Sequence, residues 1–332
     1  MTPGSHLSQL ITGYCPAQAV YVAAKLNLAD LLADGPRGVA DLAAVTGTHE
    51  HSLYRLMRML AGHGIFAEQA DGRFALTPEA EFLRDGVPGS QKAFALMMGE
   101  EHYRAYGELL YSVQTGRTSF EKLFGQPVFE YLAHHPEPAA TFDAAMTAIH
   151  GRETAVILDA LDLSGVGVFA DIGGGNGSVL TETLRRHPSL RAILFDLPHV
   201  VERARPNLAG AGLLDRCDLV SGDFFASVPA GADAYFLRHI IHDWDDARAA
   251  AILRNCRAAL KPGGRVLVAE SVIPPGNDSF FGKDLDLTML VLPGGQERTE
   301  GEYRALFAAA GLRLSRIVPT ASELSVLEAV AA

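Results

Sequence analysis

The residues best suited to chemistry are a glycine-rich segment and the aspartate before it. A-D-I-G-G-G-N-G-S spans residues 170–178, between a segment expected to be a strand and one expected to be a helix. Glycine tolerates positive φ and lets a ligand approach the backbone, and open α/β sheets bind ligands at the carboxyl ends of their strands. We therefore predict that Gly173 and Gly175 form part of a cofactor site.

Acidic side chains near these glycines indicate the charge of the cofactor. Asp171 can receive an ammonium group, and Asp196 ends the next apolar segment, where a carboxylate can accept both hydroxyls of a ribose. In G-D-F-F, residues 222–225, Asp223 offers a hydrogen-bond acceptor and Phe224 a flat surface beside an adenine. Three acidic groups suit a cationic, phosphate-free cofactor better than a pyrophosphate.

A nicotinamide dinucleotide is the alternative cofactor for a glycine-rich loop of this kind. Its G-x-G-x-x-G spacing fails in both frames, because Ser178 ends one frame and Leu180 ends the other. The spacing disfavours a dehydrogenase without excluding it.

His242 is the candidate general base. It lies in L-R-H-I-I-H-D-W-D-D, just past the fourth predicted strand and on the same sheet edge as the glycines. With an ordinary pKa of about 6.5, an imidazole is largely neutral at cell pH and can take a proton from a hydroxyl such as a phenol. The alternative is a histidine on a polar surface loop. We expect Asp243 to cap a helix that begins near Trp244.

No metal site is predicted. The sequence lacks H-x-x-x-H and paired cysteines near these residues, and proton removal by His242 requires no metal. Cys15, Cys217 and Cys256 are far apart and odd in number, so we expect neither disulfides nor a zinc site.

Alternating strands and helices must position these residues. Apolar strand-like runs occur at 166–172, 192–197, 217–222, 233–240 and 264–271, with helix-like stretches at 178–187 and 245–260. This alternation is typical of a parallel sheet covered on both faces. The runs 311–319 and 323–330 predict a final hairpin.

The first part of the chain is expected to be helical. Residues 7–34 predict one or two largely buried helices, and 38–78 predict a winged-helix pattern of two helices, a turn at Gly47 and a small β-wing. The wing segment suits either DNA recognition or a platform for dimerisation. Residues 91–162 predict further helices whose methionines and aromatics lie mostly in the core, with a subset lining a pocket.

Composition limits the function classes. A length of 332 residues favours two domains, and a net charge of -11 disfavours nucleic-acid binding. The N-terminal residues lack a signal-peptide pattern, and no window approaches about 18 consecutive apolar residues. We therefore expect a cytoplasmic protein that binds neither membranes nor nucleic acid.

Five ordered segments carry a family resemblance: D-I-G-G-G-N-G, F-D-L-P, G-D-F-F, R-H-I-I-H-D-W and G-G-Q-E-R-T. Across nearly its whole length the chain resembles the plant caffeate-type O-methyltransferase family, particularly its bacterial natural-product branch. The resemblance implies an α/β fold with a Rossmann-like class I methyltransferase domain, mostly parallel with a C-terminal antiparallel hairpin. It also implies a helical, winged-helix-like dimerisation domain over 1–90, a helical connector contributing to the substrate pocket over 91–162, and the methyltransferase domain over 163–332.

The resemblance also implies the reaction. S-Adenosylmethionine would donate a methyl group to a hydroxyl of a small aromatic, phenolic or polyketide-type metabolite, leaving S-adenosylhomocysteine, and the enzyme would be a homodimer. The H-D-W match places the family's catalytic histidine on His242. Glu270 and Glu297 are equal candidates for fixing the tautomer of its ring; salt bridges of these glutamates with Arg265, Arg298 or Arg304 are the alternative.

Further cofactor contacts follow from the matched segments. They add Leu197 in F-D-L-P and Gly222 in G-D-F-F, and Arg238 where plant relatives usually carry a lysine.

Two alternative functions stay open. One is the same fold and cofactor with decarboxylation or hydroxylation instead of methyl transfer, and the other is a winged-helix regulator that senses a ligand.

Overall fold

The computed structural model describes residues 4–332, apart from the side chains of His150 and Arg152. The chain divides into two compact units. One contains the residues up to Gly107 together with Val128–His150, and the other contains Glu108–Pro127 and Gly151–Ala332. The three-segment division expected from the sequence stays a prediction.

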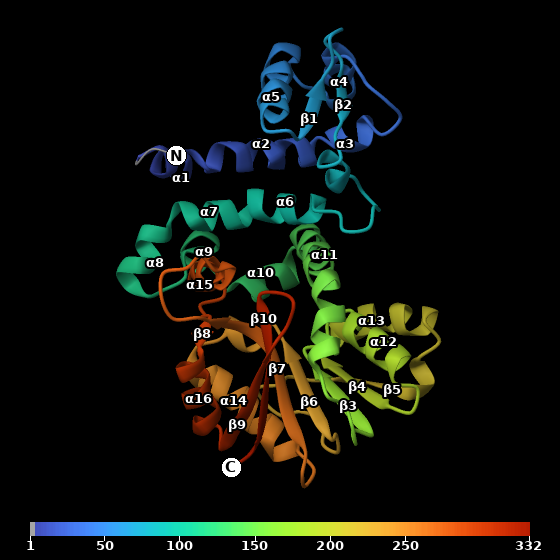
Figure 1. Ribbon diagram of the computed structural model, residues 1–332, viewed down its shortest axis with the longest axis vertical. Helices are drawn as coiled ribbons and strands as arrows, with labels where there is room; N and C mark the ends of the chain where they lie inside the picture. The colour runs from blue at the N-terminus through green and yellow to red at the C-terminus, as the bar shows by residue number, and fades with distance from the viewer. Residues whose placement is uncertain (1–3) are drawn as a thin grey trace. The chain divides into compact units, whose positions relative to one another are not determined.

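The second unit is built on a twisted sheet (Figure 1). Its strands lie in the order β5-β4-β3-β6-β7-β10-β9, and the first five are parallel. The strands are β3 (Val168–Ile172), β4 (Arg191–Asp196), β5 (Cys217–Ser221), β6 (Ala234–Arg238), β7 (Arg265–Ile273), β9 (Leu312–Pro319) and β10 (Leu324–Ala331). The predicted C-terminal antiparallel hairpin is confirmed, because β10 lies antiparallel between β7 and β9.

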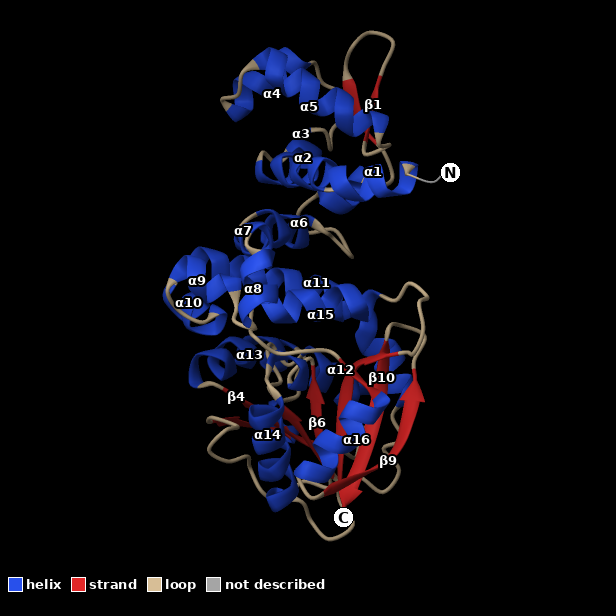
Figure 2. Cartoon of the chain, turned by 90° about the vertical axis from the view of Figure 1, so that its left-hand side faces the viewer, coloured by secondary structure: helices blue, strands red, loops and turns tan. Residues whose placement is uncertain are grey.

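Helices cover both faces of this sheet (Figures 1 and 2). Side chains alternate across a strand, so Tyr235 and Leu237 of β6 enter one core and Ala234 and Phe236 enter the other. The first core is closed by α14 (Asp246–Ala259) and α16 (Glu300–Ala309). The second is closed by α12 (Ser178–Arg186), α13 (Pro198–Gly210) and the end of α11 (Pro136–Ala160). The carboxyl ends of five parallel strands therefore meet at one edge.

Short elements complete this unit. They are α8 (Leu109–Thr115), α9 (Ser119–Phe124), η2 (Leu214–Arg216), η3 (Ile241–Asp243), α15 (Phe281–Val291) and β8 (Arg298–Thr299), which pairs with the end of β7. The segment η3 directly follows β6, so it lies at the carboxyl edge of the sheet.

The first unit contains the winged-helix pattern. Its elements are α1 (Ser5–Thr12), α2 (Tyr14–Lys25), α3 (Leu28–Leu31), α4 (Val39–Thr46), α5 (Glu50–Gly62), β1 (Phe66–Glu68), β2 (Phe74–Leu76), η1 (Ala80–Leu83), α6 (Lys92–Gly99), α7 (Glu101–Gly107), α10 (Val128–His134) and the first part of α11. The turn after α4 is at Gly47, with φ 66°, and β1 pairs antiparallel with β2 as the wing.

Two expectations about burial are wrong. The sequence predicts one or two largely buried helices over 7–34, whereas three helices form and α1 buries no residue within the chain. Leu7, Leu10 and Ile11 are 60–66% exposed, because no other element of the described chain covers this apolar face. The methionine and aromatic side chains of 91–162 were expected mostly in the core, but among those that the structure describes only Met97 and Phe120 are buried.

Candidate active site

The glycine loop after β3 has the conformation that its sequence predicts. Gly173 and Gly175 have φ of 72° and 55°, a region that residues with a Cβ rarely occupy. A Cβ on Gly173 would collide with the side chain of Ile240, whereas one on Gly175 would meet no described atom within 4 Å. The loop therefore packs tightly against the β6 side and leaves open space at Gly175.

Asp171 is a buried carboxylate with spare hydrogen-bonding capacity. It is 2% exposed, and its Oδ2 has no hydrogen-bond partner among the described residues. Burial raises the pKa of Asp171 to about 7, while the nearby positive charge of Arg238 acts in the opposite direction. An ammonium group at Oδ2 would satisfy this oxygen and favour its ionised form.

Arg238, at the end of β6, donates from Nη1 to Thr154 Oγ1 at 2.9 Å. Burial lowers its pKa, and the charges of Asp171 and Glu153 oppose that shift. The guanidinium of Arg238, the predicted positive charge, thus lies beside Asp171, and one of its nitrogens donates a hydrogen bond to Thr154 of α11.

Asp196 joins the loop to the neighbouring strand. Its Oδ2 accepts from the Gly175 amide at 2.9 Å and its Oδ1 from the Leu197 amide at 2.7 Å. Each carboxylate oxygen keeps a second lone pair that a ribose hydroxyl could use. Leu197 is 45% exposed and lies beside these oxygens in sequence, so it can offer an apolar surface to a bound ligand.

The segment after β5 supplies an aromatic surface. Asp223 Oδ1 accepts from the Phe225 amide at 2.8 Å, which closes a tight turn that presents half-buried Phe224. Both phenyl rings pack edge-on against Trp244. A Cβ on Gly222 would lie 2.6 Å from the ring of Phe195, so this turn also requires glycine.

These residues suit a cationic adenosyl cofactor. The predicted cofactor contacts include three acidic residues, Asp171, Asp196 and Asp223. Among these contacts only Arg238 carries a positive charge. A pyrophosphate would add negative charge beside two carboxylates, one of which is fully buried. An ammonium and a sulfonium would instead compensate them.

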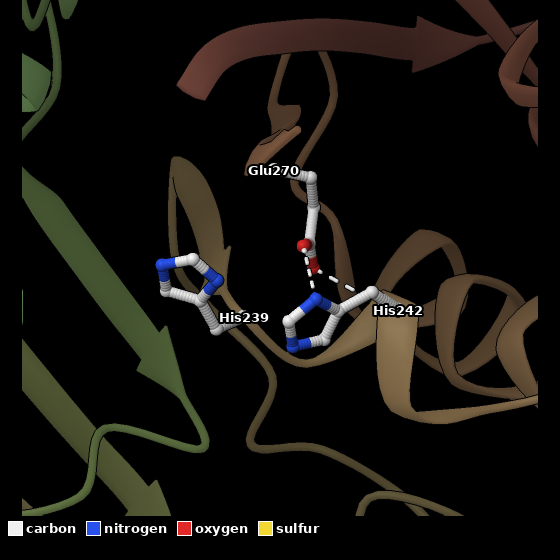
Figure 3. A group of neighbouring side chains, drawn as sticks. All are labelled: His239, His242 and Glu270. Atoms are coloured by element: carbon white, nitrogen blue, oxygen red, sulfur yellow. Dashed lines mark hydrogen bonds and ion pairs between the residues drawn. The ribbon is translucent and has the colours of Figure 1, made fainter. Parts of the chain in front are cut away.

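His242, in η3, is held by three carboxylates, of which Figure 3 draws Glu270. Its Nδ1 lies 2.6 Å from Glu297 Oε1 and 3.5 Å from Glu270 Oε2, and its Nε2 lies 3.6 Å from Asp243 Oδ1. The short contact assigns the Nδ1 proton to a hydrogen bond with Glu297. When the ring is deprotonated, Nε2 carries the lone pair that another partner can use.

Glu270 and Glu297, ranked equally from the sequence, make different contacts. Glu270 Oε1 accepts from the backbone amides of Ile240, Ile241 and His242 at 3.0, 2.9 and 3.4 Å. Glu270 therefore holds the backbone of η3, whereas Glu297 contacts the imidazole directly.

The expectation of a neutral His242 with an ordinary pKa is wrong. Burial by itself would lower the pKa of His242, but Glu270, Asp243 and Glu297 raise it to about 10. Burial raises the pKa of Glu270 to about 7 and that of Asp243 to about 6. The cluster carries more carboxylates than cations, so it binds protons more tightly than an isolated imidazole would.

Two local alternatives are also resolved. Asp243 does not cap the next helix: α14 begins at Asp246, and Asp245 accepts from the Arg248 amide as its N-cap. The arginines considered as partners of the two glutamates pair elsewhere, as Arg265–Glu328, Arg298–Asp246 and Arg304–Glu300.

His239 is a functional candidate that the sequence analysis missed. It has φ 52°, unusual for a residue with a Cβ, and its Nε2 lies 2.9 Å from Glu153 Oε2. Burial lowers its pKa well below the ordinary value. Its ring centre is 5.1 Å from that of His242, and Figure 3 shows the two rings side by side. The H-x-x-H spacing in R-H-I-I-H was the available signal.

His239, His242 and Glu270 place donor atoms within 4.8 Å of one another, close enough to suit a metal ion. The sequence does not predict that these three side chains converge. Both imidazoles already contact carboxylates of the chain, at Glu153 and Glu297. That the reaction needs no metal stays a prediction.

Comparison with known proteins settles the family. The O-methyltransferase domain family matches residues 106–313, and the O-methyltransferase dimerisation domain family matches residues 8–85. The chain belongs to the O-methyltransferase family. It is an S-adenosylmethionine-dependent O-methyltransferase, with the class I fold and the N-terminal dimerisation domain that the motifs predict.

Three relatives of this O-methyltransferase are informative. It is 50% identical to the phenazine O-methyltransferase PhzM of Lysobacter antibioticus over 98% of this chain and 95% of that one. The crystal structure of NcsB1, an O-methyltransferase from neocarzinostatin biosynthesis in complex with S-adenosylmethionine and 2-hydroxy-5-methyl naphthoic acid, has a TM-score of 0.87 and 35% identity, with 96% of each chain covered. Aclacinomycin 10-hydroxylase RdmB of Streptomyces purpurascens is 38% identical over 93% of this chain and 83% of that one.

Family membership excludes a nicotinamide dehydrogenase and a winged-helix regulator as the main function of this O-methyltransferase. The winged-helix pattern of α4, α5 and the wing lies inside the matched dimerisation domain. None of the helices in the described part of the chain is long and apolar enough to cross a membrane.

Proposed function

We propose that this O-methyltransferase methylates a phenolic hydroxyl of a small, flat aromatic metabolite, with His242 as general base. The observation that carries the proposal is the 2.6 Å contact between His242 Nδ1 and Glu297 Oε1. It fixes the tautomer that leaves Nε2 as the proton acceptor.

The residues of the glycine loop and the adjacent strand ends would hold the cofactor. Asp171 would bind the ammonium group, Asp196 the ribose hydroxyls, and Phe224 the adenine ring. Gly173, Gly175, Leu197, Gly222, Asp223 and Arg238 complete the proposed cofactor contacts. When bound, the cofactor supplies an electrophilic methyl group on a sulfonium.

Proton removal is the part of the reaction that the chain itself performs. The acceptor hydroxyl transfers its proton to His242 Nε2, and its oxygen keeps the electron pair that forms the new bond to the methyl carbon. Glu297, Glu270 and Asp243 stabilise the resulting imidazolium. A pKa of His242 of about 10 matches that of a phenol, about 10, so this transfer is close to balanced.

The relatives support an aromatic acceptor. PhzM is named as a phenazine O-methyltransferase, and NcsB1 was crystallised with a hydroxylated naphthoic acid. Phenazines and naphthoic acids both contain a planar, fused aromatic ring system. We propose an acceptor of the same class for this chain.

Hydroxylation is the second candidate, because RdmB is named as a hydroxylase and shares 38% identity. The arrangement of His242 and Glu297 favours methyl transfer, since removal of a proton from a hydroxyl activates its oxygen toward a methyl group. The fate of the cofactor's methyl group distinguishes the two reactions.

A direct test of the base compares the wild type with His242→Ala. We expect kcat to fall about 10²- to 10⁴-fold, the usual contribution of general-base catalysis. Calorimetry should show unchanged affinity for S-adenosylhomocysteine, because Asp171 and Asp196 remain. Full turnover by the variant would contradict the role of His242.

We further propose that two copies associate through the N-terminal unit. The matched dimerisation domain and the exposed apolar face of α1, with Leu7, Leu10 and Ile11, support this assembly. An uncovered apolar helix face is typical of a surface that a partner buries.

A further inference from the structure

Residues 295–298 lie against the η3 segment that carries His242. A Cβ on Gly295 would collide with the carbonyl oxygen of His242, and the Gln296 amide donates to that same oxygen at 2.9 Å. The following residue, Glu297, contacts His242 Nδ1. Three consecutive residues therefore contact the backbone or the ring of one histidine.

Arg298, the next residue, is fully buried and uses every donor it has. Nη1 donates to the carbonyl oxygens of Ile241 and Gln296 at 3.2 and 3.3 Å, and Nη2 donates to that of Trp244 at 2.8 Å. Nε and Nη2 donate to Asp246 Oδ1 at 3.0 and 2.9 Å. These five contacts match the five N–H groups of a guanidinium.

The carbonyl groups that Arg298 contacts lie on both sides of His242 along the chain. Ile241 comes directly before it, and Trp244 lies two residues after it. A planar, five-donor fork fixes the separation and orientation of its acceptors, whereas an ammonium cannot reach all of them at once. Arg298 thus restrains η3 from one side while Glu270 holds its amides from another.

The burial of Arg298 is unfavourable for stability unless its charge is compensated. Burying a cation requires compensation, and the one carboxylate that pairs with Arg298, Asp246, has a side chain that is 70% exposed. The other three contacts go to carbonyl groups, two of them close to His242 in the chain, at Ile241 and Trp244, and one at Gln296. The charge is therefore directed at the segment that carries the general base.

We propose that Arg298 is a positioning residue for methyl transfer, which orients His242 toward Glu297 by fixing the carbonyl groups of Ile241 and Trp244. The proposal rests on the proposed role of His242. Arg298 itself contacts neither substrate nor cofactor; it acts through η3.

The test replaces Arg298→Lys, which keeps the charge and loses the fork. The matched control is Arg304→Lys on α16, whose guanidinium pairs only with exposed Glu300. We expect Arg298→Lys to lower kcat about 10- to 100-fold, as small misplacements of catalytic groups do, with unchanged KM for both substrates. Its pH profile should shift to lower pH, because a displaced imidazole loses the stabilising contact with Glu297. Arg304→Lys should match the wild type in every respect.

A wild-type kcat and pH profile for Arg298→Lys would overturn the inference. So would a loss of kcat that is fully explained by the fraction of unfolded Arg298→Lys protein, measured from its melting curve. If Arg298→Lys does not fold, Asp246→Ala removes an exposed partner of the same guanidinium and should show a smaller loss of kcat with the same pH shift. Wild-type behaviour of that variant would then overturn it. Retained activity in His242→Ala would instead contradict the proposed function, whatever Arg298→Lys does.

Discussion

At the scale of single residues, the site depends on two glutamates with different partners. Glu297 contacts the imidazole of His242, and Glu270 accepts three backbone amides from Ile240 to His242. Both glutamates raise the pKa of His242, but only Glu270 also holds the backbone of its loop. Replacing Glu270 therefore changes the shape of the loop as well, whereas replacing Glu297 changes mainly the contact with the imidazole.

Glu297→Gln should lower the limiting kcat at high pH, where the imidazole is unprotonated, without lowering the melting temperature. The amide can still accept from Nδ1, but it removes a negative charge that raises the pKa of His242. Hydrogen bonds to charged groups are worth about 1.5–3 kcal/mol, so we expect a loss of about 10- to 100-fold in kcat. Steady-state kinetics and a thermal melt on the same sample check this; a lower melting temperature with unaltered kcat would contradict it.

Glu270→Ala should destabilise the fold. It leaves the amides of Ile240, Ile241 and His242 without their acceptor, and each buried unsatisfied donor costs about 1–3 kcal/mol. Glu270→Gln is the matched control, because its amide oxygen can still accept these bonds. We expect a clear drop in Tm for the alanine variant and a smaller one for the glutamine variant. Equal Tm values would contradict the assigned role of Glu270.

The pH dependence follows from the raised pKa of His242. Only the unprotonated imidazole accepts a proton, so kcat/KM should rise with pH as the value of about 10 is approached. A histidine with the ordinary pKa would instead give a plateau above about 7. A pH–rate profile measures this, with the affinity for S-adenosylhomocysteine determined at each pH as the control. A plateau of kcat/KM at neutral pH would contradict the raised pKa of His242 in the free enzyme.

His242 could be predicted from sequence because H-D-W follows a strand directly, and strand ends meet at one edge. His239 could not, because its left-handed φ and its contact with Glu153, 86 residues away, depend on how the chain folds back. The raised pKa of His242 could not be predicted either, because it depends on three carboxylates, Glu270, Asp243 and Glu297, lying together around one buried ring. The catalytic and cofactor-binding roles of these residues stay predictions.

At the scale of elements, the proposed cofactor site depends on the loop between β3 and α12. Gly173→Ala should weaken binding of S-adenosylhomocysteine, because a Cβ there collides with Ile240 and pushes the loop away from β6. Gly165→Ala is the matched control: it has a similar positive φ of 75° but no atom within 4 Å of the added Cβ. Calorimetry should show lower affinity for the first variant and wild-type affinity for the second. Equal affinities would contradict the importance of this close approach.

The strands and helices of the sheet were predictable because apolar runs and helical periods are local properties. Each of the five parallel strands falls within or next to its expected run, as β6 at Ala234–Arg238 does within 233–240. The exposure of α1 was not predictable, since an apolar sequence predicts that a helix is buried and does not show whether the same chain or a second copy covers it.

At the scale of the whole molecule, dimerisation follows from that uncovered face. Leu10→Asp, at a position 66% exposed on α1, should convert a particle of twice 35.5 kDa into a monomer. Leu214→Asp, at an exposed leucine of the other unit, should leave the particle mass unchanged. Light scattering coupled to size-exclusion chromatography measures the masses. A monomeric wild type would contradict the proposed assembly.

The central claim is tested most directly by following the methyl group itself. The enzyme is incubated with S-adenosylmethionine carrying a deuterated methyl group and a panel of hydroxylated phenazines and naphthoic acids, and the products are analysed by mass spectrometry. We predict a product that carries the intact deuterated methyl group on oxygen, formed by the wild type and reduced at least about 100-fold in His242→Ala. A product that gains oxygen or loses carbon dioxide without gaining the label would contradict methyl transfer as the reaction of this protein.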